Sequence, residues 1–445
     1  MTTQIFYAST LYGAVTLAAA LDSGCFPPAG RRLLLVANNA AVPETAVPLD
    51  RMPGFERLRD RFDSVLSWND TVAPFHPGGW SPRPDDVPLW ERYLRLLWGL
   101  GEEPVELVVE SLQVAPALTV AQLFPDAAID VYADGLMSYG PTRSKLDPLV
   151  GERVRRLLHL DLVPGLRPLL LAEFGAAAEV VPTEAFTKVV DELAEPVDAP
   201  EGAALILGQY LSALGILSPA EEEALHIRMV RGAVARGHRR IVFKPHPVAS
   251  ASWSRVLERE AAELGADLTV LARPVLAEVL FRRLRPALVV ACFSTGLFTA
   301  ARFYGVPVAR LGTGPLLDRL SPYQNSNRVP VTLADALVPD LETGEAHGVD
   351  DLTGLLHAVG FAMQPQVRPD LRPAAERYLA AHPDDRSRRY FKRRRLTVLG
   401  LPGGLPVPRN ALVRRLARRA RRLGRAALRR RLKPPTAKRT APDRT

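Results

Sequence analysis

Residues 4–21 of this 445-residue chain read QIFYASTLYGAVTLAAAL, a strand pattern followed at once by a helix pattern. Residues 4–8 are mostly apolar, which is typical of a strand buried on both faces inside a parallel sheet. After the small polar residues Ser9 and Thr10, residues 11–21 form an apolar stretch of helical length. A strand that leads directly into a helix is the first half of a βαβ unit, so this stretch predicts an α/β fold.

The same alternation continues along the chain. A helix is predicted at 114–123, and further buried strands are predicted at 32–36, 64–68, 105–109 and 128–132. A helix at 183–193 then leads into EPVDAPEG at 195–202, whose Pro, Gly and acidic residues are typical of a linker. We therefore expect a first Rossmann-like domain over residues 1–200.

The alternation restarts after the linker. Strands are predicted at 204–207, 240–243, 267–271 and 287–291, and helices at 219–236, 253–264 and 277–283. This pattern predicts a second Rossmann-like domain over 201–385, followed by a tail over 386–445. Ligands would bind at the carboxyl ends of the strands, in a cleft that the two domains face.

The net charge of +9 combines two opposite parts. Residues 386–445 hold 22 of the 57 Lys and Arg residues and a single acid, Asp443. The rest of the chain carries 35 basic and 47 acidic residues and is therefore acidic. A partner inferred from the total charge would be assigned to the wrong part of the molecule.

Two features suggest where the protein works. Cys25 and Cys292 are the only cysteines, which indicates a reducing compartment and argues against structural zinc. The first positive charge is Arg31, so residues 11–21 lack the basic segment of a signal peptide. We expect a cytoplasmic protein without a spanning helix, because no run of about 18 uncharged apolar residues occurs.

Polar residues follow three of the predicted strands. Residues 129–135 read IDVYADG, which places Asp134 and Gly135 directly after a strand, although Asp-Gly there is also typical of a simple turn. Residues 241–247 read IVFKPHP, so two prolines hold His246 in a rigid loop. A rigid histidine at a cleft can donate to a phosphate or protonate a leaving group, whereas a structural turn is the alternative.

The chain has a second His-Pro pair and a third predicted strand that is followed by polar residues. His76-Pro77 lies in a loop with no preceding strand, and we assign it no role. Residues 289–296 read VVACFSTG and precede a predicted helix at 297–303. The positive end of this helix would thus carry the hydroxyl and backbone N–H groups of Ser294, Thr295 and Gly296, which suits an anion. The alternative is that Ser and Thr serve simply as N-caps.

In this order and spacing, the three motifs resemble the bacterial sialyltransferase pattern of an acidic pair with Gly, a His-Pro motif and a Ser-Ser/Thr motif. The chain resembles the bacterial α-2,8-polysialyltransferase family over about residues 1–335, with supporting pieces LGQ at 207–209 and NSNRVP at 325–330. The pattern is broken at Ala133, where the family has the first acid of the pair. The resemblance implies a GT-B glycosyltransferase.

The resemblance also implies a mechanism. A sugar, in the simplest case sialic acid, would pass from a CMP-activated donor to a cell-surface glycan with inversion, without a metal or other cofactor. Asp134 would be the general base, and His246, Ser294 and Thr295 would hold the departing phosphate. Closing the cleft would assemble the site and exclude water. The sequence agrees in having no Asp-x-Asp metal motif at a strand end.

The resemblance also points to weaker candidates for the site. Each of them could have a structural role instead. Glu278 would accept hydrogen bonds from the ribose, or be an exposed helical glutamate. Ser9 and Thr10 would contact the sugar or the acceptor. The remaining candidates for the nucleotide sugar are Gly296, Gly208, Gln209, Lys244 and Pro247.

Residues 412–431 of the tail are sorted as in an amphipathic helix, with an apolar arc opposite an arginine face. The arc consists of Leu412, Val413, Leu416, Ala420, Leu423 and Ala427. Such a helix predicts binding to an anionic membrane surface through residues 410–431, on the inner face of the cell membrane. Nucleic-acid binding, which we do not expect, and a solvated tail are the alternatives.

Two other functions remain open from the sequence. A CDP-glycerol-type polyol-phosphate transferase would combine a similar His-Pro and Ser/Thr phosphate site with a membrane-bound polymer. A catalytically inactive GT-B scaffold, which binds a glycan at the membrane, would account for Ala133.

Overall fold

The computed structural model describes residues 2–133, 135–246 and 251–405. Residues 1–392 form one compact unit, and 393–445 form a second. The described part of the second unit contains one helix, α17 (Arg393–Leu399). The predicted tail helix at 412–431 lies outside the described residues. The predicted domain limits at 200 and 385 stay predictions.

The first half of the large unit contains a seven-stranded sheet in the order β3-β2-β1-β4-β5-β6-β7, and all neighbouring strands are parallel. The strands are β1 (Thr3–Ala8), β2 (Arg31–Val36), β3 (Ser64–Ser67), β4 (Val105–Glu110), β5 (Ala128–Tyr132), β6 (Val154–Leu160) and β7 (Ala177–Val181). The helices are α1 (Leu11–Asp22), α2 (Glu56–Arg59), α3 (Trp68–Val72), α4 (Val87–Leu97), α5 (Ala117–Leu123), α6 (Pro148–Gly151) and α7 (Thr183–Leu193). The strand order reverses between β1 and β4, which makes this pair the topological switch point.

The second half contains a five-stranded parallel sheet in the order β10-β9-β8-β11-β12, with its switch point between β8 and β11. The strands are β8 (Ala204–Leu207), β9 (Arg240–Lys244), β10 (Asp267–Val270), β11 (Leu288–Ala291) and β12 (Val308–Arg310). The helices that accompany or follow it are α8 (Pro219–Ala235), α9 (Ala251–Glu263), α10 (Ala277–Leu284), α11 (Thr295–Tyr304), α12 (Thr313–Arg319), α13 (Arg328–Leu337), α14 (Leu352–Met363), α15 (Arg372–Ala381) and α16 (Asp385–Arg388). The predicted α/β fold with two Rossmann-like sheets is confirmed.

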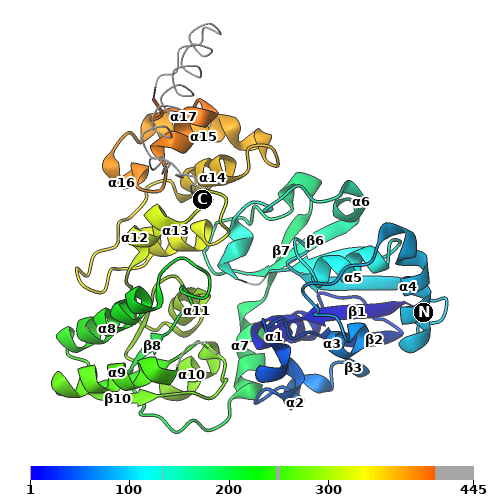
Figure 1. Cartoon of the computed structure of the whole chain (residues 1–445), viewed down its shortest axis with the longest axis horizontal. Coiled ribbons are helices and arrows are strands. Elements are labelled where there is room, and N and C mark those ends of the chain that lie inside the picture. The colour runs from blue at the N-terminus through cyan, green and yellow to red at the C-terminus, as the bar shows by residue number, and fades with distance from the viewer. Residues whose placement is uncertain (1, 134, 247–250, 406–445) are drawn as a thin grey trace, which may run out of the picture. The chain divides into compact units, whose positions relative to one another are not determined.

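The opening stretch of the sequence forms the centre of the first sheet, as predicted. All six residues of β1 are buried because the strand has paired neighbours on both sides and is covered on both faces. Helix α1 follows at once, and Thr10 is its N-cap, accepting from Gly13 N at 3.0 Å. Helix α7 packs against α1 and also against α10 of the second half, and lies between them in Figure 1.

Strands β6 and β7 were missing from the prediction because charged residues interrupt the apolar pattern. Arg155 and Arg156 of β6 both pair with Asp130 of β5, at 3.0 Å each. Asp130 is fully buried, so the two guanidinium groups compensate its charge inside the sheet. Strand β12 was missed because it is only three residues long. Several predicted ends also shift; for example, α5 starts only after Pro116, Trp68 opens α3, and α11 starts at Thr295 instead of residue 297.

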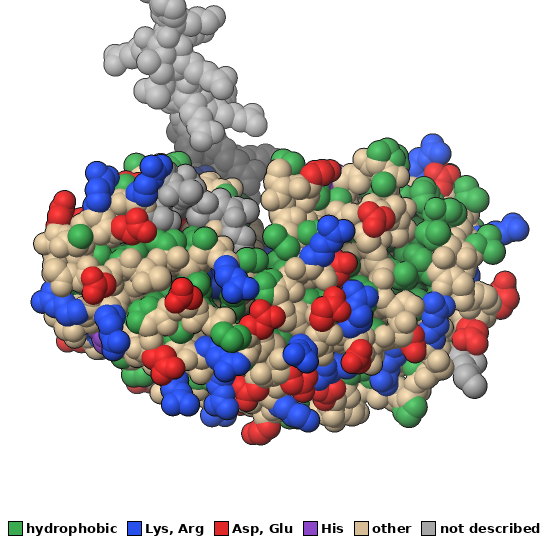
Figure 2. All heavy atoms as spheres, turned by 90° about the horizontal axis from the view of Figure 1, so that it is seen from below, with side chains coloured by type: hydrophobic (Ala, Val, Ile, Leu, Met, Phe, Trp, Pro, Cys, Tyr) green, Lys and Arg blue, Asp and Glu red, His purple; other side chains and the backbone are tan. Residues whose placement is uncertain are grey.

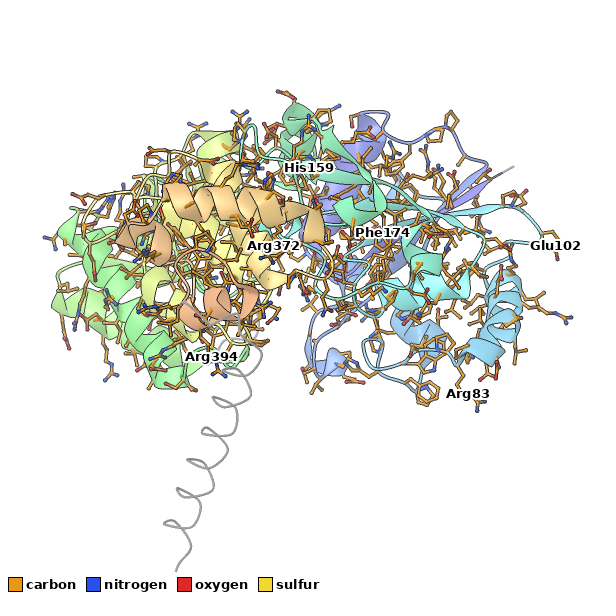
Figure 3. All side chains as sticks on the ribbon, turned by 90° about the horizontal axis from the view of Figure 1, so that it is seen from above. Arg83, Glu102, His159, Phe174, Arg372 and Arg394 are labelled. Atoms are coloured by element: carbon orange, nitrogen blue, oxygen red, sulfur yellow. The ribbon has the colours of Figure 1, made fainter. Side chains whose placement is uncertain are left out.

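The surface of the large unit mixes charges of both signs. On the face seen in Figure 2, Lys and Arg side chains alternate with Asp and Glu side chains and form no large single-sign patch. Arg83 and Glu102 point outward at the edge of the first half in Figure 3. The acidic excess of the large unit is therefore spread out on this face. Among the helices of the described residues, none is long and apolar enough to cross a membrane.

Candidate functional site

Three loops meet at the carboxyl edge of the second sheet. Gly208 and Gln209 follow β8, His246 follows β9, and Ser294 follows β11. Because β8 and β11 form the switch point of this sheet, their loops open the crevice in which ligands of such folds bind. The structure therefore brings together residues that the sequence placed up to 86 positions apart.

Gln209 and Gly208 tie these loops to one another. Gln209 Oε1 accepts hydrogen bonds from the backbone N–H groups of Cys292, at 3.0 Å, and Phe293, at 3.1 Å. Gly208 N donates to Lys244 O at 2.9 Å, and a Cβ at Gly208 would lie 3.0 Å from the Phe243 ring. Gln209 thus fixes the backbone that presents Ser294, and Gly208 allows the His-Pro loop to approach.

Ser294, Thr295 and Gly296 open helix α11. Ser294 Oγ caps the helix by accepting from Gly296 N at 3.1 Å, which leaves the hydroxyl hydrogen available for a ligand. A Cβ at Gly296 would lie 2.8 Å from Leu207 Cδ1, so glycine is what lets the helix start so close to β8. The N-terminus of a ten-residue helix adds positive potential at this point.

His246 lies against Tyr210, with ring centroids 4.0 Å apart. Burial, and to a smaller extent the nearby Lys244 charge, lowers the pKa of His246 to about 4. The imidazole is therefore neutral at pH 7, with one N–H donor and one acceptor nitrogen. A bound phosphate would favour the protonated ring and raise this pKa.

Lys244 and Glu278 lie deeper than the sequence suggested. The Glu278 side chain is 3% exposed and accepts from Thr299 Oγ1 at 2.7 Å, so the alternative of an exposed helical glutamate is wrong. Burial raises the pKa of Glu278, and the nearby Lys244 charge acts in the opposite direction. Burial lowers the pKa of Lys244, and the Glu278 charge acts against that shift. Neither residue lines the described pocket, so their contact with a nucleotide stays a prediction.

A pocket of about 250 Å³ lies where these loops converge. Five predicted site residues line it, namely Gly208, Gln209, His246, Ser294 and Thr295. Leu136 and Met137 contribute to the wall from the first half of the chain. The remaining lining residues are Tyr210, Leu211, Leu214, Phe293, Asn327 and Pro330.

The first and third motifs adjoin at this pocket. Leu136 N donates to Thr295 Oγ1 at 3.4 Å. Gly135 adopts φ +110°, and a Cβ there would lie 2.5 Å from the same oxygen, so only glycine fits. The turn after β5 therefore touches the start of α11. Asp134 and Pro247 themselves lie outside the described residues.

Ser9 and Thr10 lie at the switch point of the first sheet and do not line the pocket. The backbone N–H of Ser9 donates to Glu110 Oε2 at 3.3 Å, and its hydroxyl donates to Glu110 Oε1. The Tyr132 hydroxyl lies 3.1 Å from Glu110 Oε2. The contacts of Ser9 and Thr10 in the structure are thus a buried carboxylate and a helix cap, and their contact with a sugar stays a prediction.

Two residues that line the pocket, and two that fix loops near the predicted residues, were missed from the sequence. Glu110 ends β4 one residue after the predicted strand, which is the signal that could have identified it. Tyr210 directly follows Gly208-Gln209, and Asn327 lies within the NSNRVP stretch. Arg328 next to Asn327 is buried and donates to Tyr323 O at 2.8 Å and Leu320 O at 2.9 Å, which fixes the loop before α13.

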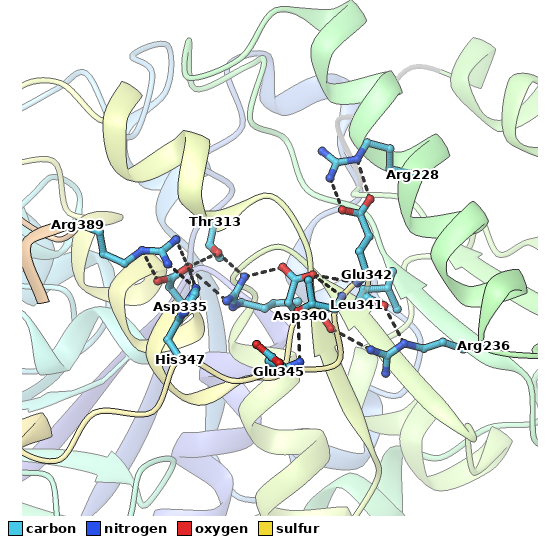
Figure 4. A network of polar contacts seen from close by, with 12 residues as sticks. Arg228, Arg236, Thr313, Asp335, Asp340, Leu341, Glu342, Glu345, His347 and Arg389 are labelled. Atoms are coloured by element: carbon cyan, nitrogen blue, oxygen red, sulfur yellow. Dashed lines mark hydrogen bonds and ion pairs between the residues drawn. The ribbon is translucent and has the colours of Figure 1, made fainter. Parts of the chain in front are cut away.

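A separate network of charges lies beyond the pocket in the second half (Figure 4). Buried Asp335 of α13 accepts from Thr313 Oγ1 at 2.6 Å and pairs with Arg389 at 3.1 Å. Arg310 of β12 links this group to Asp340 at 2.9 Å. The network ties β12 to the helices that follow it. Across the described ranges, no three His, Cys, Asp or Glu side chains gather as a metal site would require.

Solved structures similar to this chain include several glycosyltransferases. The GT-B domain of a sialyltransferase from Photobacterium damselae is 12% identical, over 77% of this chain and 99% of that chain, with a TM-score of 0.41. MurG from Acinetobacter baumannii is 11% identical, over 84% and 93%, with a TM-score of 0.39. UGT2 from Phytolacca americana is 12% identical, over 85% and 100%, with a TM-score of 0.39. No curated protein matches the sequence.

Two doubly wound sheets and a pocket lined by hydroxyl, imidazole and backbone groups at the second switch point are typical of a GT-B glycosyltransferase. The sequence model of the alpha-2,8-polysialyltransferase family matches residues 4–313. The chain belongs to this family and is a sialyltransferase-like glycosyltransferase, an enzyme with a nucleotide-sugar donor and a glycan acceptor.

Proposed function

We propose that the protein transfers a sialic acid or a related sugar from a CMP-activated donor to a cell-surface glycan. The observation that carries this proposal is the convergence of Gly208, Gln209, His246, Ser294 and Thr295 on one pocket at the switch point of the second sheet. These groups suit a nucleoside monophosphate, because hydroxyls, a helix N-terminus and an imidazole all bind phosphate oxygens.

The donor phosphate would lie at the start of α11. The Ser294 and Thr295 hydroxyls would donate to its oxygens, and the positive helix end would stabilise their charge. The His246 ring is neutral at pH 7 because burial lowers its pKa to about 4. The donor phosphate, which carries one negative charge while it is esterified to the sugar, would raise that pKa, so the ring would take a proton from solvent. It would donate this proton to the phosphate as the bond to the sugar breaks and a second negative charge develops.

Asp134 would act as the general base. Its carboxylate would take the proton of the acceptor hydroxyl as the new bond to the anomeric carbon forms and the bond to the CMP phosphate breaks. The close approach of Gly135 and Leu136 to Thr295 supports this role, because Asp134 directly precedes Gly135 in the sequence and Thr295 is a proposed phosphate-binding residue. A direct displacement of this kind inverts the anomeric carbon, and we propose that it needs neither a metal nor another cofactor.

The acceptor would be at the cell membrane. Residues 410–431 would bind the anionic inner face as an amphipathic helix, with basic residues contributing about 1 kcal/mol each near the surface. This location suits an enzyme that extends a surface glycan from the cytoplasm. We expect no nucleic acid to bind.

The test compares two site variants with a matched histidine control. Release of CMP from CMP-sialic acid in the presence of a glycan acceptor is followed for the wild type, Asp134→Asn, His246→Ala and His238→Ala. His238 belongs to the same half of the chain but does not line the pocket. We expect about a hundredfold loss or more for the first two variants and no loss for His238→Ala, because acid–base groups contribute roughly 10²- to 10⁴-fold. Wild-type rates in both site variants would show that the roles are assigned wrongly.

A further inference from the structure

A second cavity, of about 540 Å³, lies at the carboxyl ends of β2 and β3 in the first half of the chain. It is about twice the volume of the pocket at α11. The loops after β2 and after α3 form its walls. The polar and aromatic residues that line it include Glu44, Asp50, Arg51, Asp70, Phe75 and His76.

Hydrogen bonds join the loop after β2 to helix α3 and to the loop after α3. Asn38 N donates to Asn69 Oδ1 at 2.8 Å, and Asn69 Nδ2 donates back to Asn38 O at 3.0 Å. Gly78 N donates to His76 Nδ1 at 3.2 Å, which leaves Nε2–H of this ring to donate to Ala40 O at 2.9 Å. His76, which the sequence left without a role, thus joins the two walls.

The lining suits a carbohydrate. The Phe75 side chain is 54% exposed and stacks on Trp80, with an interplanar angle of 19° and ring centroids 6.2 Å apart. An exposed, supported aromatic ring can pack against the apolar face of a sugar ring. The carboxylates of Glu44, Asp50 and Asp70 can accept hydrogen bonds from sugar hydroxyls.

The charge of the lining favours a neutral chain over an anionic one. Glu44, Asp50 and Asp70 contribute three carboxylates, against the single guanidinium of Arg51. None of these four charges has an ion-pair partner among the described residues. A chain with a carboxylate on every sugar would meet net repulsion within a Debye length, about 8 Å at physiological salt.

The cavity lies at the edge of the sheet at which β5 also ends. The strand order β3-β2-β1-β4-β5 places β2 three strand spacings from β5, or about 14 Å. Asp134 follows β5 by two residues. An extended oligosaccharide with its reacting end beside β5 could therefore reach the cavity along the carboxyl edge of the sheet.

From this placement and chemistry we infer that the cavity at β2 and β3 binds the distal sugars of a neutral oligosaccharide acceptor. The inference rests on the proposed function, because it assigns the acceptor of that reaction. It predicts that the enzyme distinguishes acceptors by length and by charge.

The test measures kcat and KM with two neutral acceptors that end in the same sugar, a disaccharide and a longer oligosaccharide. Phe75→Ala is compared with Tyr93→Ala, which removes an exposed aromatic ring of the same half that does not line the cavity. We expect Phe75→Ala to raise KM for the longer acceptor about tenfold, the factor that one lost favourable contact of this size implies. KM for the disaccharide and hydrolysis of the donor without acceptor should not change.

A charge variant and a binding measurement complete the test. Glu44→Lys should improve the use of an oligomer of α-2,8-linked sialic acid, because it reverses one of the repelling charges. An unchanged KM for the longer acceptor in Phe75→Ala, or tighter wild-type binding of the sialic acid oligomer than of the neutral chain, would overturn the inference. Binding of the longer oligosaccharide to wild type and Phe75→Ala, measured by calorimetry without donor, tests the cavity even if no donor is turned over.

Discussion

At the scale of single residues, Thr295 and Gly135 connect the two halves of the site. Thr295 Oγ1 accepts from Leu136 N and lies where a Cβ of residue 135 would have to be, at 2.5 Å. The turn that contains the proposed base therefore depends on a glycine. A Gly135→Ala variant therefore tests the shape of the site, because it adds a single methyl group and removes no catalytic group.

Gly135→Ala should reduce transfer at least tenfold, because the alanine is strained at φ +110° by roughly 1–3 kcal/mol and collides with Thr295. The measurement is kcat/KM together with the thermal unfolding midpoint. Gly24→Ala is the matched control, since Gly24 also has positive φ, at +74°, but has no atom within 4 Å of its Cβ position. Equal transfer by the two variants would mean that the turn after β5 does not shape the site.

The sequence could predict residues that directly follow a strand, and the structure brings five of these to one pocket. It could not predict Asn327, because the loop before α13 reaches the pocket through tertiary packing, about 30 residues after α11 begins. The sequence also could not predict that Gln209 fixes the backbone before Ser294, because its side chain accepts hydrogen bonds from backbone N–H groups more than 80 positions away.

At the scale of elements, strands with mostly apolar side chains could be predicted, and a strand interrupted by two consecutive arginines could not. The strands that carry the proposed site, β5, β8, β9 and β11, belong to the first kind, although β5 also contains the buried Asp130. Strand β6 belongs to the second, because Arg155 and Arg156 are compensated by Asp130 only in the folded sheet. The fold around the site was therefore more predictable than the far edge of the first sheet.

The element predicted at residues 412–431 has a direct test. The full chain and a chain that ends at Leu405 are mixed with vesicles that contain anionic phosphatidylserine and floated on a density gradient. We expect only the full chain to float, and less of it at high salt, because the arginine face acts through screened charges. Replacing Leu412, Leu416 and Leu423 by Ser should also reduce flotation while keeping every charge. Equal flotation of the two chains would exclude membrane binding through the tail.

At the scale of the whole molecule, the net charge of +9 describes neither the acidic part of the chain before residue 386 nor the basic tail that follows it. The acidic part of the chain contains a pocket whose hydroxyls, helix end and imidazole suit a phosphate, so local dipoles there act against the overall charge. We propose that the basic tail determines where the enzyme works. We expect this pocket to select the donor, and the identity of the donor is what separates the proposed function from the polyol-phosphate alternative.

The most direct measurement is donor preference with the full chain. CMP-sialic acid, CDP-glycerol and a UDP-sugar are each incubated with the protein and a glycan acceptor, and the released nucleotide and the product are identified by mass spectrometry and NMR. The proposed function predicts release of CMP, matched by a sialylated acceptor with inverted anomeric configuration. Turnover of CDP-glycerol or the UDP-sugar, with CMP-sialic acid left intact, would contradict it.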